Sequence, residues 1–178
     1  MKVSVYIFLS FVLFACAQKA SNTYVGRAKN FYKVDDSLFR SAQPSRLEMK
    51  TLSDSGIKTV LNLRLLWNDE LEAKNTNLVL IHQPINTNKI AYEDIVVAMK
   101  AIHSAPKPVL IHCLHGSDRT GCMVAAYRMV FSGWTKEEAI KEFLDERFGY
   151  HQKYFPNILI LLQTVDVEQL KKELGVSP

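Results

Sequence analysis

Residues 108–121 read PVLIHCLHGSDRTG, a short apolar run followed directly by a polar loop that contains glycine. The run 108–112 has the length and apolar character of a buried strand. From Arg119 onward the pattern predicts a helix that continues to about Ser132, where Gly133 ends it. The segment therefore places a loop between the carboxyl end of a strand and the amino end of a helix.

The chain on either side of this segment alternates between strand-like and helix-like patterns. Residues 57–63 (IKTVLNL) and 78–82 are short runs typical of strands, and residues 92–104 have the apolar spacing of an amphipathic helix. Thr135 and Glu138 form a capping box for a helix predicted to end near residue 149. The other predicted elements are a hairpin over 31–34 and 38–41, helices over 44–56 and 69–74, and a last helix over 156–174. This alternation predicts an α/β fold with a central, largely parallel sheet flanked by helices.

The composition is that of one globular domain. The chain has 178 residues, of which 48% are hydrophobic and 22% are charged, and its formal net charge is +4. This length is enough to bury an apolar core without covalent staples. Three cysteines cannot all pair within the chain, which excludes a disulfide scaffold. The mild positive charge suits an acidic ligand without identifying one, and no nucleic-acid partner is predicted.

The first 17 residues have the features of an export signal. Lys2 precedes an apolar run over residues 3–17, which suits a signal peptide and is shorter than the roughly 20 residues that span a bilayer. Two processing routes are open: cleavage after Ala17, or lipidation of Cys16 within Leu-Phe-Ala-Cys, which resembles a bacterial lipobox. An uncleaved anchor is a third reading. We expect a periplasmic protein or a membrane-anchored lipoprotein, with a polar tether over 18–30 and the folded domain over 31–178.

The loop contains the residue types that transfer of a phosphoryl group requires. Cys113 is the candidate nucleophile, because a helix N-terminus and a nearby cation favour the thiolate. Gly116 permits a tight loop whose N–H groups surround an anion, and Arg119 can return its planar guanidinium to two oxygens of that anion. Thr120 can donate its hydroxyl to the sulfur or help to release phosphate from the intermediate, and His112 can hydrogen-bond the loop backbone.

Residues 112–121, HCLHGSDRTG, resemble the H-C-x5-R-[ST]-G signature of protein tyrosine and dual-specificity phosphatases. The resemblance runs from about Phe31 to Phe148 and includes LFRSAQP at 38–44 and GIKTV at 56–60. Among these enzymes the chain looks most like the exported tyrosine phosphatases of bacterial periplasms. The resemblance implies a phosphatase domain over 31–178 that works through a phosphocysteine on Cys113, without a metal ion or another cofactor. It implies that phosphate is bound by Leu114, His115, Gly116, Ser117, Asp118 and Arg119.

The general acid departs from the pattern of this family. Related enzymes carry an aspartate on a loop that precedes the cysteine, but residues 82–90 (HQPINTNKI) contain no carboxylate, and Asn88 stands in its place. Asparagine is not a useful proton donor at neutral pH. Asp118 is the predicted substitute, as in phosphatases that have a G-x-D-R-T-G loop. Glu93 and Asp94 are the alternatives. In a further reading, Asp118 only caps the helix or forms a salt bridge nearby, and the reaction relies on good leaving groups.

Phosphotyrosine on proteins is the predicted substrate, with phosphoserine and phosphothreonine as further candidates, so the expected partner is a phosphorylated protein. Enzymes selective for highly charged inositol phosphates tend to carry lysines in this loop, whereas only His115 can add positive charge here. A phosphoinositide phosphatase remains an alternative, because G-x-D-R loops also occur in enzymes that accept such lipids. Arg40 and Arg64 are expected at the mouth of the site or in surface salt bridges.

Other proteins also place a cysteine in an anion-binding loop. A rhodanese-like sulfurtransferase or an arsenate reductase is disfavoured by the late position of Cys113 and, for the former, by the Arg-Thr-Gly that ends the loop. A phosphate-binding pseudophosphatase stays open, because Asn88 replaces the expected acid. A metal cluster of His112, Cys113 and His115 is disfavoured, since no second ligand pair stands at zinc spacing.

The cysteine and histidines outside the loop are expected to have no part in the chemistry. Cys122 lies on the helix predicted after the loop, next to Met123 and Val124. It is expected to be packed and inert, with protection of Cys113 as a disulfide partner as the alternative. The remaining histidines are expected to be structural or surface residues: His82, His103 and His151.

Overall fold

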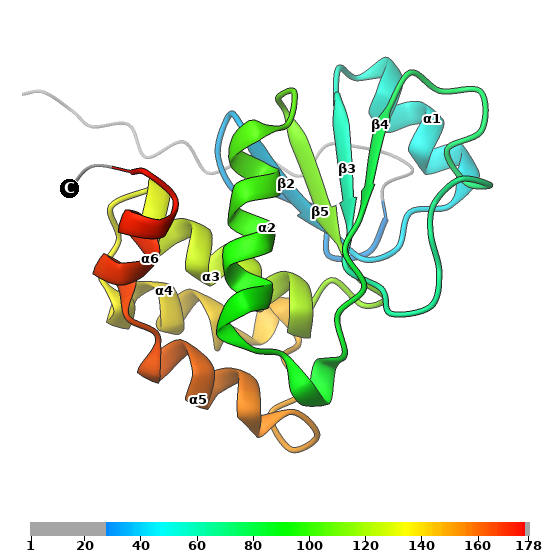
Figure 1. The fold of residues 1–178 in the computed structure, drawn as a ribbon. Coiled ribbons are helices and arrows are strands. Elements are labelled where there is room, and N and C mark those ends of the chain that lie inside the picture. The colour runs from blue at the N-terminus through cyan, green and yellow to red at the C-terminus, as the bar shows by residue number, and fades with distance from the viewer. Residues whose placement is uncertain (1–27, 177–178) are drawn as a thin grey trace, which may run out of the picture.

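A five-stranded sheet forms the centre of the structure, a computed structural model that describes residues 28–176 (Figure 1). The strands lie in the order β1 (Tyr32–Lys33), β2 (Leu38–Ser41), β5 (Val109–His112), β3 (Thr59–Asn62) and β4 (Val79–His82). β1 pairs with β2 in the antiparallel direction, and all the other neighbouring strands are parallel. The predicted α/β fold with a largely parallel sheet is confirmed.

Helices cover both faces of the sheet. Figure 1 shows α1 (Arg46–Asp54) on one side and the remaining helices on the other. The latter are η1 (Thr87–Lys89), α2 (Tyr92–Ser104), α3 (Asp118–Phe131), α4 (Lys136–Phe143), η2 (Glu146–Phe148), α5 (Pro156–Thr164) and α6 (Val167–Glu173). The capping box of Thr135 and Glu138 opens α4 as predicted.

Three predicted helices differ from the structure. Residues 70–75 form turns, and Asn75 has a φ of +68°, which no helix continues through. The helix predicted up to residue 149 ends at Phe143. The predicted helix over 156–174 divides into α5 and α6, because the side chain of Asp166 caps a new helix by accepting from the backbone N–H of Gln169.

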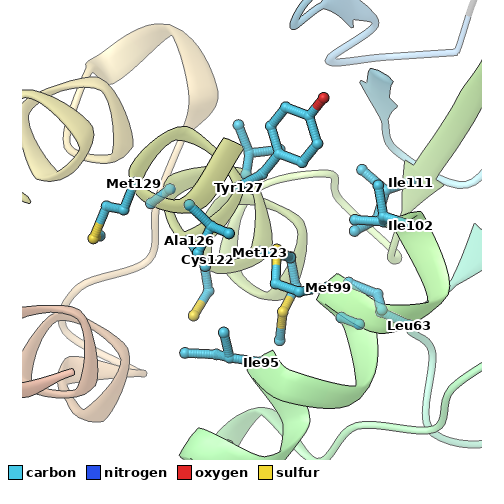
Figure 2. Packing of buried hydrophobic residues seen from close by; sticks show 14 of the residues in the cluster. Leu63, Ile95, Met99, Ile102, Ile111, Cys122, Met123, Ala126, Tyr127 and Met129 are labelled. Atoms are coloured by element: carbon cyan, nitrogen blue, oxygen red, sulfur yellow. The ribbon is translucent and has the colours of Figure 1, made fainter. Parts of the chain in front are cut away.

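Alternate residues of the strands build two cores. Leu61 and Ile111 point to the side of α2 and α3, whereas Val60 and Leu110 pack with Met49 of α1. α3 is buried along almost its whole length, and Figure 2 shows its side chains packed among those of α2 and the sheet. The helix that follows the candidate loop is therefore fixed on several sides. This fixes the position of its N-terminus at the carboxyl edge of the sheet.

The packed domain begins earlier than the predicted boundary at residue 31. Ala28 is buried, and the carbonyl oxygen of Lys29 accepts a hydrogen bond from the backbone N–H of Ala42. The expected signal segment and Cys16 lie outside the described residues. Within residues 28–176, the helices are all too short or too polar to cross a bilayer.

Candidate active site

The loop that the sequence singled out joins β5 to α3 at the carboxyl edge of the sheet. Cys113 follows the last residue of β5 and is 1% exposed, and α3 begins at Asp118. Gly116 has a φ of +73°, and a Cβ atom at this position would lie 2.5 Å from the backbone carbon of Ser41. The loop therefore turns against the end of β2 in a way that only glycine allows.

Arg119 lies in the first turn of α3 and contacts the ends of two strands. Its Nη1 donates to the carbonyl oxygens of Leu63 (3.1 Å) and Ile85 (3.3 Å), which follow β3 and β4. Its Nε is buried and has no hydrogen-bond partner within residues 28–176. Buried nitrogens of this kind usually have a partner. A fixed guanidinium with an unused donor thus lies in the first turn of α3, directly after the cysteine loop, and such a group can bind an anion.

A chain of hydrogen bonds leads from Arg64 to the loop. Nη1 of Arg64 donates to Oε1 of Gln43 (2.9 Å), and Nε2 of Gln43 donates to Oδ1 of Asp69 (2.9 Å). Oδ2 of Asp69 lies 2.8 Å from Nε2 of His112, whose Nδ1 lies 3.2 Å from the carbonyl oxygen of Cys113. His112 thus contacts the loop backbone as predicted, and Asp69 anchors it from the other side.

The lowered pKa of the Asp69 carboxyl indicates that this anchor of His112 is a charged group. Burial by itself raises the pKa of the Asp69 carboxyl, but the hydrogen bonds and charge of His112, together with the amides of Gln43 and Asn62, outweigh burial and hold that pKa below its ordinary value. The carboxylate is therefore ionised at neutral pH. A buried carboxylate with this set of donors fixes the ring of His112 and, through it, the start of the loop.

We expect Asp69→Ala to lower the free energy of unfolding by about 2 kcal/mol at neutral pH, because buried His112 loses its partner. Folding lowers the pKa of Asp69, so its contribution is complete above the ordinary carboxyl pKa and is lost as the pH falls through the lowered value. Urea unfolding of both proteins at a series of pH values should show the difference shrinking toward acid. A difference that stays constant down to about pH 3 would contradict this account.

Arg40 lies beneath the loop and not at its mouth. It is 2% exposed, its Nη2 donates to the carbonyl oxygen of Gly116 (2.8 Å), and its guanidinium lies 4.0 Å from the centre of the Phe148 ring. Burial lowers the pKa of Arg40 to about 10. The expectation that this arginine lines the mouth or forms a surface salt bridge is wrong. Arg40 lies within β2, and its side chain points under the loop.

Asn30, from the predicted tether, holds the other side of the loop. Its Nδ2 donates to the carbonyl oxygens of His115 (2.9 Å) and Phe148 (3.2 Å) and to Oγ of Ser117 (3.3 Å). Asn30 has a φ of +54°, a conformation that asparagine adopts more readily than most residues. The buried position of Ser117 follows from this contact, while Leu114 and His115 are exposed on the outer side of the loop.

Asp118, the predicted general acid, is buried and paired. It is 5% exposed, and its Oδ1 accepts a hydrogen bond from the backbone N–H of His151 (2.9 Å). Its Oδ2 lies 2.9 Å from Nδ1 of the His151 ring. The side chain of His151 is 40% exposed, and its ring centre lies 5.4 Å from that of His115. The structure thus brings one carboxylate and two imidazoles together at the start of α3.

The same three side chains have the spacing of metal ligands. One ligand atom from each of His115, Asp118 and His151 lies within 4.8 Å of the others, and such a donor set suits zinc. This group shares only His115 with the cluster considered from the sequence, since His112 is turned toward Asp69. The direct contact between Asp118 and His151 satisfies both groups without an ion.

The two alternative acids, and the asparagine that stands in place of the family's aspartate, are placed differently from Asp118. Asn88, that asparagine, is exposed on η1. Asp94 accepts a hydrogen bond from the backbone N–H of Ala91 through Oδ2 (2.9 Å), so it caps the start of α2. Glu93 is exposed on the same helical turn. Asn157 of α5 donates to the carbonyl oxygen of Thr87 (3.0 Å) and thereby holds η1 against the helical layer.

Two residues of α3 complete the surroundings of the loop. Oγ1 of Thr120 is buried and has no hydrogen-bond partner within residues 28–176, so the expected bond to the sulfur of Cys113 is not formed. Cys122 is fully buried, and Figure 2 shows it pointing toward Ile95 of α2. Burial raises the pKa of the Cys122 thiol to about 12, so it does not ionise at neutral pH. Cys113 and Cys122 are both free thiols.

Three residues that organise the site were not identified from the sequence: Asn30, Asp69 and His151. His151 was expected to be structural or on the surface, and Asp69 was placed in a helix. None of the three belongs to a motif. Their partners in the loop lie 85, 43 and 33 positions away along the chain, so no local pattern marks them.

Comparison with known proteins gives a consistent picture. A family model described as "Polymorphic toxin system, DSP-PTPase phosphatase" matches residues 36–133. The dual specificity protein phosphatase TpbA of Pseudomonas aeruginosa is 29% identical over 122 residues, which cover 67% of this chain and 56% of TpbA. The dual specificity protein phosphatase H1 of Variola virus is 30% identical over 114 residues, covering 61% of this chain and 56% of that protein. The chain thus spans about half the length of the curated relatives it matches.

Solved structures agree with these relatives. The crystal structure of P. aeruginosa TpbA matches with a TM-score of 0.75 at 26% identity, covering 83% of this chain and 91% of that one. A structure of TpbA with its cysteine changed to serine, in complex with pTyr, matches equally well at 25% identity and the same coverage. The catalytic domain of the S. cerevisiae PP-IP phosphatase Siw14 shares the fold, with a TM-score of 0.71 at 21% identity over 87% of this chain and 98% of that one.

Proposed function

The chain belongs to the family described as "Polymorphic toxin system, DSP-PTPase phosphatase", and from this premise we propose that it hydrolyses phosphate monoesters through a phosphocysteine on Cys113. The observation that carries the proposal is the loop geometry. A buried cysteine at the end of β5 faces the N-terminus of α3, the loop turns tightly at Gly116, and Arg119 is fixed beside it. Backbone N–H groups at a helix N-terminus bind phosphate well.

The proposed reaction has two steps. In the first, the thiolate of Cys113 attacks phosphorus, the bond from phosphorus to the leaving oxygen breaks, and that oxygen takes a proton. In the second, water attacks phosphorus, the bond from sulfur to phosphorus breaks, and inorganic phosphate leaves. Arg119 and the loop N–H groups stabilise the equatorial oxygens as charge develops on them. The pair of Asp118 and His151 is the proposed source of the proton, and it receives one from water in the second step.

An aromatic phosphate ester fits the rim of the loop. Leu114 is 45% exposed, and the loop contains no lysine. The backbone N–H of Gln43 donates to the carbonyl oxygen of Leu114 (3.2 Å), and its side chain contacts Arg64, so the segment after β3 lies near this rim. That segment adds exposed apolar side chains: Leu65, Leu66 and Trp67. The complex of the similar TpbA with pTyr supports phosphotyrosine on a protein as the substrate class.

Phosphate release from three substrates tests this preference. We expect kcat/KM for a phosphotyrosine peptide to exceed that for the same peptide with phosphoserine by about 100-fold, since contacts to the aromatic ring are lost. A dispersed phosphoinositide should be the poorest substrate. Leu114→Lys should raise the relative rate on the phosphoinositide by adding charge at the rim. If wild type prefers the phosphoinositide, the alternative of a lipid phosphatase replaces phosphotyrosine hydrolysis.

We also propose that the protein is exported. Support comes from Lys2, the apolar run over 3–17 and the resemblance of residues 13–16 to a lipobox, which would make Cys16 the site of a lipid anchor. A phosphorylated protein in the periplasm or at the membrane surface would then be the partner.

A further inference from the structure

The leaving-group acid is the part of the proposed reaction that the sequence places least well. Residues 82–90 contain no carboxylate, and Asp94 is engaged in capping α2. Asp118 lies in the loop itself, but both of its oxygens contact His151. Either Asp118 or His151 could donate the proton to the leaving group, and their contacts distinguish the two.

Asp118 has the contacts of an orienting group. A backbone N–H only donates, so Oδ1 of Asp118 accepts from His151 through a lone pair. Oδ2 faces Nδ1 of the same residue at 2.9 Å. With 5% of its surface exposed and both oxygens engaged, Asp118 has little contact left for a substrate atom. An aspartate that holds the Nδ1 side of an imidazole is the arrangement by which carboxylates fix a catalytic histidine.

The ring of His151 has the complementary orientation. Because Nδ1 is turned toward Asp118, Nε2 lies on the opposite side of the ring and away from the carboxylate. The side chain is 40% exposed. Its ring lies beside that of His115, 5.4 Å between centres, and the side chain of His115 is exposed on the outer side of the loop. The side of the ring opposite Asp118 therefore belongs to a half-exposed side chain that lies against the loop.

We propose that His151 is the general acid of this site and that Asp118 positions it; the inference rests on the proposed phosphatase activity. In the imidazolium form, Nδ1–H donates to Asp118, and Nε2–H gives its proton to the leaving oxygen as the bond from phosphorus to oxygen breaks. Neutral His151 then takes a proton from the water that attacks the phosphocysteine, which restores the imidazolium. Asp118 accepts the hydrogen bond from Nδ1–H in both steps and keeps the ring in place.

The proposal gives the reaction a distinct dependence on pH. The groups that face His151 are Asp118 from α3, His115 from the loop and Tyr154, whose ring centre lies 6.5 Å away. Imidazoles lose their proton nearer to neutrality than carboxylic acids do. The rate on substrates that need an acid should therefore fall at basic pH, and this basic limb should disappear when His151 is replaced.

The test compares two esters, p-nitrophenyl phosphate and phenyl phosphate, in wild type, His151→Gln and Asp118→Asn. p-Nitrophenolate leaves with little need of a proton, whereas phenolate needs one. We expect His151→Gln to lose about 100-fold in kcat/KM on phenyl phosphate and less than about 10-fold on p-nitrophenyl phosphate. Asp118→Asn should lose less on phenyl phosphate and keep a basic limb, because His151 is still present.

The matched control is His103→Gln, on α2, where the ring stacks on Phe131; it should behave as wild type. Equal losses of His151→Gln on the two esters would mean that this histidine only supports the loop, and would overturn the proposal. A larger leaving-group effect in Asp118→Asn than in His151→Gln would assign the proton to Asp118 instead. A wild type that hydrolyses neither ester would overturn the phosphatase function itself, and this inference with it.

Discussion

Cys113→Ser is expected to lower kcat on p-nitrophenyl phosphate by about 10,000-fold or more. The cysteine lies in the loop between the end of β5 and the start of α3. A thiol in this setting can ionise, whereas a serine hydroxyl is a weak nucleophile unless a base activates it. The loop backbone and Arg119 are unchanged by the substitution. The dissociation constant of a phosphotyrosine peptide, measured by calorimetry, should therefore stay within about threefold of that of wild type, measured under conditions in which turnover is slow.

Cys122→Ala is the matched control, since it removes the other thiol near the loop. That thiol is fully buried between α3 and α2 and carries a raised pKa, so kcat should stay close to that of wild type. Turnover that survives in Cys113→Ser would show that the nucleophile is another group. A wild type that binds the phosphopeptide and releases no phosphate would instead favour the pseudophosphatase, the alternative that Asn88 left open.

The sequence predicts the elements whose signals are local. The strand, loop and helix of residues 108–121 follow one another without interruption, and a capping box marks α4. The helix ends that the sequence missed have a common cause. Asp145 and Asp166 stand inside apolar patterns that continue past them, yet the side chain of each accepts a hydrogen bond from a backbone N–H ahead of it and begins a new element.

The supports of the loop could not be predicted, because each one is a contact between distant parts of the chain. Arg40 reaches Gly116 across 76 positions, and Asn30 reaches His115 across 85. An arginine is more often exposed than buried, and nothing local shows that this one, within β2, lies under a loop. The parallel sheet creates these contacts: it brings the ends of β2, β3 and β5 to one edge, and side chains that follow different strands meet there.

Two guanidinium groups therefore lie near the loop and have different contacts. Arg40 contacts the carbonyl oxygen of Gly116 from within the core. Burial lowers the pKa of Arg40, and the charge of the Cys113 thiolate opposes this lowering. Arg119 contacts the ends of β3 and β4 and keeps its Nε unused. Since Arg40 is buried, it can support the thiolate but cannot leave its place to reach a substrate. Contact with phosphate is left to Arg119.

Arg119→Lys is accordingly expected to lower kcat by about 100- to 1,000-fold, although the charge is kept. A lysine ammonium is a point donor and cannot bind two phosphate oxygens in one plane. It also cannot contact the carbonyl oxygens of Leu63 and Ile85 in the geometry that now fixes the guanidinium. The loop N–H groups still bind the ground state, so KM for a phosphotyrosine peptide should change less than kcat. Steady-state kinetics that separate the two constants provide the measurement.

Arg147→Lys is the control for the change of chemistry. Arg147 pairs with Asp145 on the surface at 2.9 Å, and exposed pairs of this kind contribute little, so both constants should match those of wild type. A rise in KM with kcat unchanged in Arg119→Lys would mean that the arginine binds substrate and transition state equally. The positive charge alone would then be enough, and the rigid contacts of Arg119 to the two strand ends would serve the fold and not the chemistry. A fall in kcat ties those contacts to the transition state, because they hold the guanidinium plane before the phosphate arrives.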